Sequence, residues 1–277
     1  MKKTLLIISG GGECAEVARQ SRESGHTVVI SDSDPQAPAF AFADSCLIAD
    51  VHGAPETAAA AERYNRKIRK IDGVLCLADA AMTAATVTER LRLPGMPLHV
   101  AELIGDRMAM RRCFGSAGVP TPWHMEIFTP QELQRIVIAK GRDLILKPVD
   151  NRGADGVEPL AEASDFAAAF QRTRFHSSDE RVLVEQWLDG PRFHLAAMVI
   201  GGECHVAGTP DKAAADALAR AASAVGLNEG PLVGEIVMHQ GIAHVVEISS
   251  RLNGPHFLTA AAKLALGETP SPEDLLA

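Results

Sequence analysis

The sequence predicts an α/β N-terminal domain with a parallel sheet, followed by an α+β domain with antiparallel sheets. Short apolar runs alternate with helix-forming segments through roughly the first hundred residues, which is the pattern of a parallel sheet with helical crossovers. Two prolines in the stretch Val119–Pro122 then force an extended path, which suits a boundary. Beyond it, paired strand-like runs flank glycine turns at Gly201-Gly202 and Gly241, as antiparallel hairpins do.

In the first part of the chain, strand and helix are expected to alternate in order. The expected strands are Leu5–Ile8, Val28–Ser31 and Val74–Leu77, and the expected helices are Glu13–Glu23, a basic helix around Glu62–Lys70, and Met82–Leu91. Gly25 ends the first of these helices, because a residue without a Cβ readily takes the left-handed conformation that closes a helix.

Before the proline stretch, Asp106–Ser116 is expected to form a helix rich in arginine and methionine, and the second part of the chain follows the prolines. The expected strands are Leu144–Pro148, Val182–Glu185, the hairpin Leu195–Ile200 with Cys204–Ala207, and the hairpin Gly234–His239 with Ala243–Ile248. An alanine-rich helix, Ala213–Val225, separates the two hairpins. Strands that return directly through a glycine turn pair antiparallel, so this part is expected to be α+β.

Composition argues against several classes of partner. The net charge is −8 and only 4% of the 277 residues are aromatic, so neither a basic surface for nucleic acid nor a base-stacking platform is expected. The run Leu5–Ile8 is too short for a signal peptide, and no stretch approaches the roughly 20 apolar residues that span a membrane. The cysteines form no CxxC pair, which indicates reduced core thiols in a cytoplasmic protein: Cys14, Cys46, Cys76, Cys113 and Cys204.

A glycine turn, Gly10-Gly11-Gly12, follows the first strand, and Asp32 follows the second. This arrangement approaches the dinucleotide fingerprint, in which glycines let a pyrophosphate reach a helix N-terminus and an acid holds the ribose. Glu13 opposes that interpretation, because a carboxylate inside the turn would repel a pyrophosphate. Three interpretations stay open: a nicotinamide site, a site for another anionic or polar ligand, and a turn that is glycine-rich for backbone reasons alone.

The strand Leu144–Pro148 carries Lys147 into a loop that contains Gly153 and Gly156. Backbone N–H groups of such a loop can donate to phosphate oxygens, and the lysine adds a positive charge. An ordinary turn has the same residue pattern, so this segment alone leaves both interpretations open.

The strand Val182–Glu185 exits into Gln186-Trp187-Leu188, whose backbone groups could pair with the edge of a purine. Trp187 in such a position is more commonly a packing residue than a stacking platform. Taken alone, this segment is therefore a weak indication of a nucleotide site.

The last expected hairpin carries a pair of acids. Glu235 and Glu247 lie symmetrically about Gly241, and symmetric positions face each other across an antiparallel pair with Cβ atoms roughly 4.5–5.5 Å apart. Two facing carboxylates destabilise a hairpin unless a positive group lies between them, and Mg²⁺ is the usual solution. Alternation along the strand puts Ser249 and Arg251 on the face of Glu247. The alternative is a surface hairpin with solvated acids.

In this order, the segments around Arg107, Lys147, Glu185 and Glu247 resemble the ATP-grasp superfamily. The chain is most similar to the branch with biotin carboxylase, the carbamoyl-phosphate synthetase large chain, the purine-pathway carboxylate synthetases and the amino-acid ligases. The resemblance covers nearly the whole chain. It implies a Rossmann-like pre-ATP-grasp domain over residues 1–103 and an ATP-grasp domain over residues 104–277, with a nucleotide-binding subdomain at about 120–190.

The resemblance also implies site residues. Those expected to bind ATP are Arg107, Lys147, Gly153, Ala154, Asp155, Gly156, Glu185, Gln186, Trp187, Leu188 and Arg192. In this set, Lys147 would contact the phosphates, residues 153–156 would form the phosphate loop, and Glu185 would lie near the adenine amino group. The expected ligands of Mg²⁺, or of Mn²⁺ in its place, are Glu235, Glu247 and Ser249. Lys147 and Arg251 are the expected catalytic residues, with Arg251 stabilising the acyl phosphate or the substrate carboxylate.

The chain departs from the family pattern in five places. Arg107 stands where lysine is usual, which keeps the charge but changes the geometry. Arg192 stands where an acid usually meets the ribose hydroxyls, and Ser249 replaces an asparagine that often serves as a third metal ligand. The segment after Lys212 is shorter than in the family, and the sequence stops at Ala277, soon after the metal strand. These departures affect how the chain would contact the ribose, coordinate the metal ion and close over the substrate.

The implied reaction is an ADP-forming ligation, in which a substrate carboxylate attacks the γ-phosphorus of ATP and an amine-type nucleophile traps the acyl phosphate. Lys147, Arg251 and Mg²⁺ would neutralise the charge that spreads over the phosphoryl group, and the glycine loop would exclude water. The family also suggests a homodimer through the first domain. Two other functions stay open: an ATP-binding protein without catalysis, marked by the altered Arg107, Arg192 and Ser249, and a nicotinamide-dependent oxidoreductase.

Overall fold

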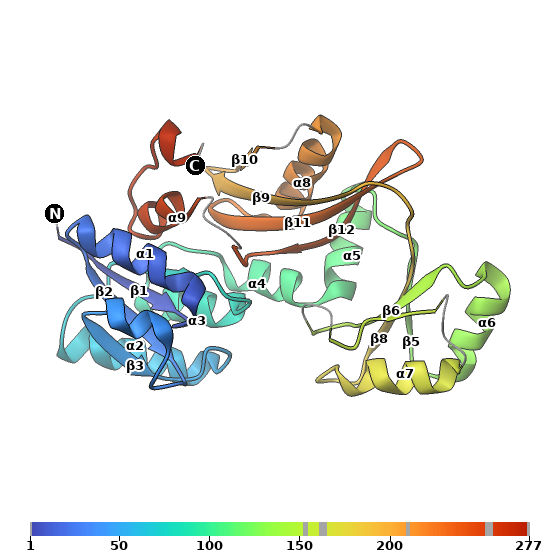
Figure 1. Cartoon of the computed structure of the whole chain (residues 1–277), viewed down its shortest axis with the longest axis horizontal. Helices are drawn as coiled ribbons and strands as arrows, with labels where there is room; N and C mark the ends of the chain where they lie inside the picture. The colour runs from blue at the N-terminus through green and yellow to red at the C-terminus, as the bar shows by residue number, and fades with distance from the viewer. Residues whose placement is uncertain (1, 152–154, 161–164, 209–210, 253–256, 276–277) are drawn as a thin grey trace.

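The structure is a computed structural model that describes residues 2–151, 155–160, 165–208, 211–252 and 257–275. Over these residues the strands form three four-stranded sheets, which lie in a row along the long axis of the molecule (Figure 1). The first sheet is parallel and the other two are antiparallel, so the predicted fold class is confirmed. Within the described ranges, we find no helix with the length and apolar character that crossing a membrane requires.

The parallel sheet has the strand order β3-β2-β1-β4. Its strands are β1 (Thr4–Ile8), β2 (Thr27–Asp32), β3 (Ser45–Ile48) and β4 (Gly73–Cys76). All five residues of β1 are buried, because helices cover both faces of the sheet. Helix α1 (Gly12–Glu23) packs on one face, and α2 (Ala54–Lys67) and α3 (Ala81–Leu91) pack on the other.

A helix from far along the chain, α9 (Leu258–Ala265), shares the first of these faces with α1. Leu266, just after α9, belongs to the same core as Leu5 of β1. Gly73 of β4 permits the close approach, since a Cβ at this position would lie 2.2 Å from the carbonyl oxygen of Ala265. The first sheet therefore depends on residues separated from it by most of the sequence.

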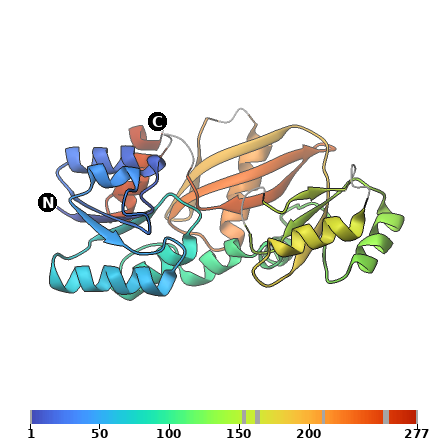
Figure 2. The same cartoon turned by 60° about the horizontal axis from the view of Figure 1, so that its bottom comes forward.

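The central sheet has the order β10-β9-β11-β12. Its strands are β9 (Arg192–Ile200), β10 (Glu203–Val206), β11 (Gly230–His239) and β12 (Ile242–Ser249). One face is covered by α4 (Leu98–Gly105), α5 (Arg107–Ser116) and α8 (Lys212–Ala224), and Figure 2 shows α8 behind the strands. Asp106 caps α5 by accepting a hydrogen bond of 2.7 Å from the backbone N–H of Ala109.

The third sheet has the order β5-β8-β6-β7. Its strands are β5 (His124–Ile127), β6 (Leu144–Pro148), β7 (Glu158–Pro159) and β8 (Val182–Gln186). Helices α6 (Pro130–Lys140) and α7 (Phe166–Phe175) pack on one face. Thr129 and Glu132 form a capping box that begins α6. Two short 3-10 helices, η1 (Pro38–Phe42) and η2 (Pro272–Leu275), complete the described elements.

Two expectations need correction. The basic helix predicted around Glu62–Lys70 begins at Ala54 and ends at Lys67. The cysteines are not all core thiols: Cys14 and Cys76 are buried, but Cys46 is exposed because it lies on β3, at the edge of the parallel sheet. The predicted domain boundary between residues 103 and 104 falls inside α4, and the division into domains stays a prediction.

Candidate active site

A cleft of about 370 Å³ opens between the central sheet and the third sheet. Its walls come from β6, β8, β9, β11, β12 and the start of α5, which are far apart in the sequence. Predicted site residues supply most of the lining: Arg107, Lys147, Glu185, Gln186, Trp187, Leu188, Arg192, Glu235 and Glu247. The fold thus brings together residues that were singled out from four separate segments.

Glu185, at the end of β8, forms the most buried ion pairs of the cleft. Its Oε2 accepts a hydrogen bond of 2.7 Å from Arg111 Nη2, and its Oε1 accepts one of 3.0 Å from Lys147 Nζ. Burial by itself would raise the pKa of this carboxyl, but the charges of Arg111 and Lys147 outweigh burial and lower the pKa to about 2. Glu185 is therefore ionised and holds Lys147 at the edge of the cleft.

Arg107 connects three parts of the site. Its side chain is 3% exposed, and its Nη1 donates to the carbonyl oxygen of Pro148 at 2.7 Å and to that of Asn151. Its Nη2 lies 3.3 Å from Glu247 Oε1 on β12. Its Nε is buried and has no hydrogen-bond partner among the described residues. Arg107 thus ties the start of α5 to the segment after β6 and to the last hairpin.

The two acids of that hairpin face each other, as predicted: Glu235 of β11 pairs with Glu247 of β12. The physical reason differs from the one expected. The hairpin loop consists of Gln240 and Gly241, both at positive φ, so its centre lies between them and an uninterrupted register would pair Glu235 with Val246. A β-bulge beside Glu235 inserts one extra residue into β12 and moves Glu247 into the facing position.

The bulge also decides which side chains reach the cleft. Neighbours on a regular strand point to opposite faces, but Val246 and Glu247 both line the cleft, while Val245 and Ile248 are buried in the core beneath α8. Arg111 fixes this geometry, because it donates from Nη1 to the carbonyl oxygen of Val245 at 3.1 Å and from Nη2 to that of Val246.

Each facing acid has a cationic partner within the chain. Arg192 Nη1 pairs with Glu235 Oε1, and Arg107 pairs with Glu247. The expectation that the two acids repel each other until a cation arrives is therefore incomplete, since the arginines already offset the repulsion. These are also two of the positions at which the chain departs from the family pattern.

The donor set fits a cation that arrives with a nucleotide. Mg²⁺ is commonly held by one or two carboxylates, with phosphate and water oxygens as its other ligands. Ser249, the expected third ligand, pairs with Val233 and is not among the residues that line the cleft. Over the part of the chain that the structure describes, no group of three or more His, Cys, Asp or Glu residues could hold a metal ion without further ligands.

The segment after β8 is less open than the sequence suggested. Gln186 donates its N–H to the carbonyl oxygen of Trp123 at 2.8 Å, and Trp187 donates its N–H to that of Asp143 at 2.9 Å. These two N–H groups are therefore not available to a purine edge. The N–H of Leu188 has no backbone partner among the described residues, which makes it the remaining donor of this segment.

Arg192 and Trp187 form a contact across the mouth of the cleft. The guanidinium carbon lies 4.5 Å from the centroid of the Trp187 ring, which is 40% exposed. Arg192, which stands at the position expected near the ribose, therefore has two partners within the chain: the Trp187 ring and the Glu235 carboxylate.

Some predicted residues do not line the cleft. Gly153 and Ala154 lie outside the described residues. Asp155 is exposed, and Gly156 lines a separate hollow, where a Cβ would lie 2.6 Å from His176 Cβ. Arg251 is exposed just beyond β12.

Sequence reasoning missed Arg111, although a signal existed. Arg107 and Arg111 are four residues apart on α5, so they share one helix face, and both are buried. Two arginines on one helix face imply acceptors nearby, and the structure supplies the buried Glu185 and the partly exposed Glu247. The apolar lining residues that were also missed are Pro122, Ile145, Val157 and Val246.

Two acids of the chain, Asp32 and Glu13, lie beside the glycine turn. Asp32 Oδ2 accepts a hydrogen bond of 2.7 Å from the N–H of Gly10. The Glu13 carboxyl oxygens lie 2.3 and 2.4 Å from the place where a Cβ on Gly11 would be. Two carboxylates at this turn oppose a pyrophosphate.

No family model matches the chain. Among curated proteins, D-alanine–D-alanine ligase of Methylococcus capsulatus is 27% identical over 115 residues, which make up 42% of this chain and 37% of that ligase. The chain spans about a third of the length of the curated relatives it matches first.

Solved structures cover the chain more completely. The biotin carboxylase domain dimer of Hydrogenobacter thermophilus 2-oxoglutarate carboxylase, in complex with MgADP, ADP and bicarbonate, has a TM-score of 0.78 at 18% identity, with 99% of this chain and 72% of that chain covered. L-amino acid ligase from Bacillus licheniformis has a TM-score of 0.74 at 20% identity, with 95% and 70% covered. These ligases and solved structures belong to the ATP-grasp superfamily, and the chain shares their fold.

Proposed function

We propose that the chain is an ATP-dependent, ADP-forming ligase that joins a carboxylate to an amine-type nucleophile through an acyl phosphate. The observation that carries this proposal is the cleft, where Lys147 and two arginines meet the facing acids Glu235 and Glu247 between two antiparallel sheets. The relatives and neighbours named as ligases support the reaction class.

In this proposal the chain acts chiefly by positioning and by charge. Lys147, held by Glu185, and the guanidinium group of Arg107 bind the phosphates of ATP, while the N–H of Leu188 donates to the purine edge. The substrate carboxylate attacks the γ-phosphorus, and the cations stabilise the negative charge that develops on the phosphoryl oxygens. Arg251 orients the substrate carboxylate or the acyl phosphate.

Glu235 and Glu247 would hold Mg²⁺, which would supply positive charge at the phosphates; one structural neighbour is complexed with MgADP. We propose Mn²⁺ as a substitute ion. For these acids to turn to a cation, Arg192 and Arg107 must give up carboxylate contacts, and the phosphates and ribose of the nucleotide offer them new acceptors.

A second candidate function is ATP binding without catalysis. It is favoured by the pairing of both acids with arginines, since a site that keeps these pairs would bind a nucleotide without loading a cation. A nicotinamide function has less support, because Asp32 and Glu13 crowd the glycine turn.

Calorimetric titration with ATP, with and without Mg²⁺, followed by an ADP-release screen of carboxylates paired with amines, tests the proposal. The expected result is tight Mg-ATP binding and ADP release that requires both substrates. ATP binding without ADP release from any pair would support the second candidate. Stabilisation by NADH but not by ATP would contradict both.

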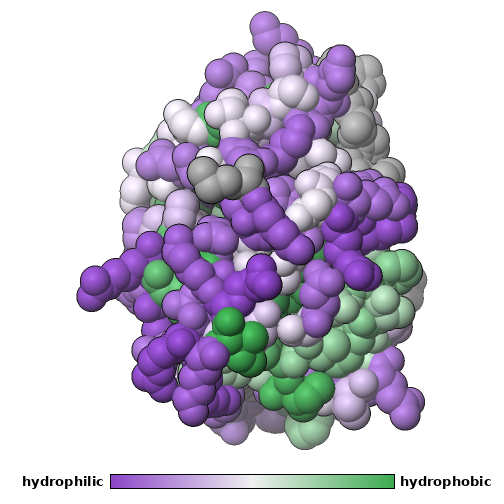
Figure 3. All heavy atoms as spheres, turned by 90° about the vertical axis from the view of Figure 1, so that its left-hand side faces the viewer, coloured by the Kyte–Doolittle hydropathy of each residue, from purple (hydrophilic) through white to green (hydrophobic). Residues whose placement is uncertain are grey.

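The end of the molecule that carries the parallel sheet is largely hydrophilic, and hydrophobic residues gather mainly in the lower part of this face (Figure 3). Two large apolar side chains in this part of the chain, Ile48 and Ile68, are 60% and 70% exposed. We propose a homodimer through the first domain, residues 1–103. Sedimentation at several protein concentrations tests for this dimer. We also propose a cytoplasmic location for the protein.

A further inference from the structure

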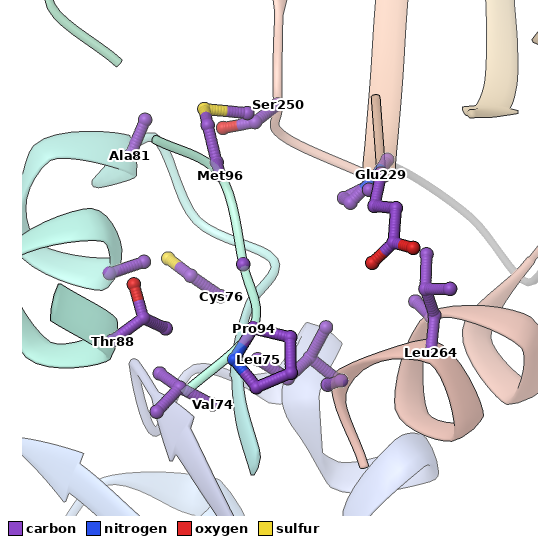
Figure 4. Close-up of a pocket in the computed structure, with 16 residues that line it drawn as sticks. Val74, Leu75, Cys76, Ala81, Thr88, Pro94, Met96, Glu229, Ser250 and Leu264 are labelled. Carbon is purple, nitrogen blue, oxygen red and sulfur yellow. The ribbon is translucent and has the colours of Figure 1, made fainter. Parts of the chain in front are cut away.

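Two cavities of the molecule differ in the charge of their lining. One lies between the parallel sheet and the central sheet, has a volume of about 80 Å³ and is lined mainly by apolar side chains (Figure 4). Among the described residues that line it, the one charged residue is Glu229, which is exposed to solvent. The cleft between the central sheet and the third sheet is lined instead by three basic and three acidic residues, among others. A charged ligand is therefore expected in the cleft and not in the apolar cavity.

Arg111 lies beneath the cleft and is not among the described residues that line it. Its side chain is fully buried, and its Nη2 donates to Glu185 Oε2 at 2.7 Å. The same guanidinium group donates to two carbonyl oxygens of β12, from Nη1 to Val245 at 3.1 Å and from Nη2 to Val246. One side chain therefore contacts both the strand that carries Glu185 and the strand that carries Glu247.

The bulge in β12 relies on these contacts. β12 is an edge strand of the central sheet, so only one of its edges pairs with β11. Away from β11, Val245 donates its N–H to the carbonyl oxygen of Pro120 at 2.8 Å, and its own carbonyl oxygen accepts from Arg111. A bulge leaves peptide groups that the neighbouring strand does not bond, and a buried carbonyl group without a donor is unfavourable. Arg111 supplies the donors immediately before Glu247.

We propose that Arg111 is a positioning residue that sets the affinity of the cleft for its divalent cation, because it fixes the backbone from which Glu247 points. The proposal rests on the proposed function, which takes Glu235 and Glu247 as the cation ligands. Arg111 acts through the backbone of β12 and touches neither the cation nor the nucleotide. Residues that orient a metal ligand in this way typically lower metal affinity by about 10- to 100-fold when they are replaced.

Arg111→Lys separates the two sets of contacts that the arginine makes. Arg111 uses both Nη1 and Nη2, whereas a lysine has a single nitrogen. A carboxylate is a stronger acceptor than a carbonyl group, so this nitrogen should stay with Glu185 and leave the carbonyl groups of the bulge without their donors. The contacts that hold Lys147 on the nucleotide side should then be kept, and the cation side should be impaired.

Calorimetry with ADP, in EDTA and in saturating Mn²⁺, measures the two sides separately. The ratio of the two dissociation constants is the gain in ADP affinity that the cation provides. In Arg111→Lys, the ADP affinity in EDTA should change little, and the gain should fall about tenfold. Arg112→Lys, which changes an exposed neighbour on α5, is the matched control and should keep both values.

The same gain in Arg111→Lys and in the parent chain overturns the proposal. An equal loss of ADP affinity with and without Mn²⁺ also overturns it, because a purely structural role produces that result. Both outcomes leave the proposed function standing. A parent chain that binds no ADP, or whose ADP affinity Mn²⁺ does not raise, refutes the proposed function and this inference together.

Glu185→Gln should give the opposite pattern to Arg111→Lys. It weakens the contact that holds Lys147 but leaves Arg111 bonded to the carbonyl groups of the bulge. ADP affinity should therefore fall by the same factor in EDTA and in Mn²⁺, with the gain unchanged. A lost gain in Glu185→Gln overturns the proposal even if Arg111→Lys fails to fold, and circular dichroism checks the fold of each variant.

Discussion

The cleft contains two kinds of ion pair, and the difference between them is burial. The buried kind centres on Glu185, where the side chains of Glu185, Arg111 and Lys147 are 2%, 0% and 10% exposed. The open kind is the pair of Arg192 and Glu235, whose side chains are 30% and 25% exposed. A buried charge that loses its partner is not solvated, because water does not reach it. A partly exposed pair can exchange partners with little change in free energy, because water solvates both charges. The buried network therefore fixes the geometry, and the open pair can respond to a ligand.

The largest expected effect comes from breaking the buried network. Arg111→Met should lower the free energy of unfolding by about 3–5 kcal/mol, because Glu185 then keeps only Lys147 and the bulge carbonyls lose their donor. Urea unfolding measures this. Arg112→Met changes an exposed neighbour on the same helix and should stay within about 0.5 kcal/mol. Similar losses in both variants would contradict a special role for the network.

Acid should weaken the same network. The pKa of Glu185 is about 2 in the folded chain, below its ordinary value of 4.5, so the unfolded chain binds this proton more readily. The stabilisation is complete above pH 4.5 and is lost as the pH falls toward 2, by an amount on the order of 3 kcal/mol. The unfolding free energy of the parent should therefore fall more steeply over this range than that of Glu185→Gln. Parallel pH curves would refute the assignment.

Lys147 connects the buried network to the ligand. Lys147→Ala should weaken Mg-ATP binding by about 10- to 100-fold, which is the range of a lost charged hydrogen bond. Since Lys147 also pairs with Glu185, the variant should lose some stability as well, so circular dichroism must confirm that it is folded. Lys140→Ala, an exposed lysine on α6, is the control for calorimetry. An unchanged ATP affinity would remove Lys147 from the proposed site.

The smallest expected effects come from replacing the two facing acids, Glu247 and Glu235, one at a time. Glu247→Gln should cost about 1–3 kcal/mol, because its partner Arg107 is buried and loses a charged acceptor. Repulsion between the two acids alone would give the opposite result, because removing one of them would then stabilise the apo chain. Glu235→Gln frees only the half-exposed Arg192 and should cost less than about 1 kcal/mol. Thermal unfolding without nucleotide compares them, and equal costs would remove the distinction between buried and open pairs.

The sequence predicted the parts of the fold that have strong local patterns. The buried strand β1 and the hairpin around Gly241 were found because their patterns need no knowledge of distant residues. The edge strands β3 (Ser45–Ile48) and β7 (Glu158–Pro159) were missed, because a short strand with one exposed side has little pattern. Helix α9 (Leu258–Ala265) was also missed. It is short, and its small apolar face is recognisable as a core face only when the first sheet that it packs against is known.

The candidate site shows the same limit. The types of Lys147, Glu185, Glu235 and Glu247 and their order along the chain were readable from sequence. Their partners were not, because packing decides which cation reaches which acid. The bulge that aims Glu247 also escaped prediction, since it depends on Arg111 bonding two carbonyl groups of a strand more than a hundred positions away.

The contact between α9 and the first sheet has a consequence for how the chain is made. Lys3 Nζ donates to the carbonyl oxygen of Leu266 at 2.7 Å although 263 positions separate the two residues. During synthesis, β1 and α1 emerge early, but part of their apolar face stays uncovered until residues 258–266 have left the ribosome. Closure over so long a separation is slow. The nascent chain therefore exposes this apolar surface through most of its translation.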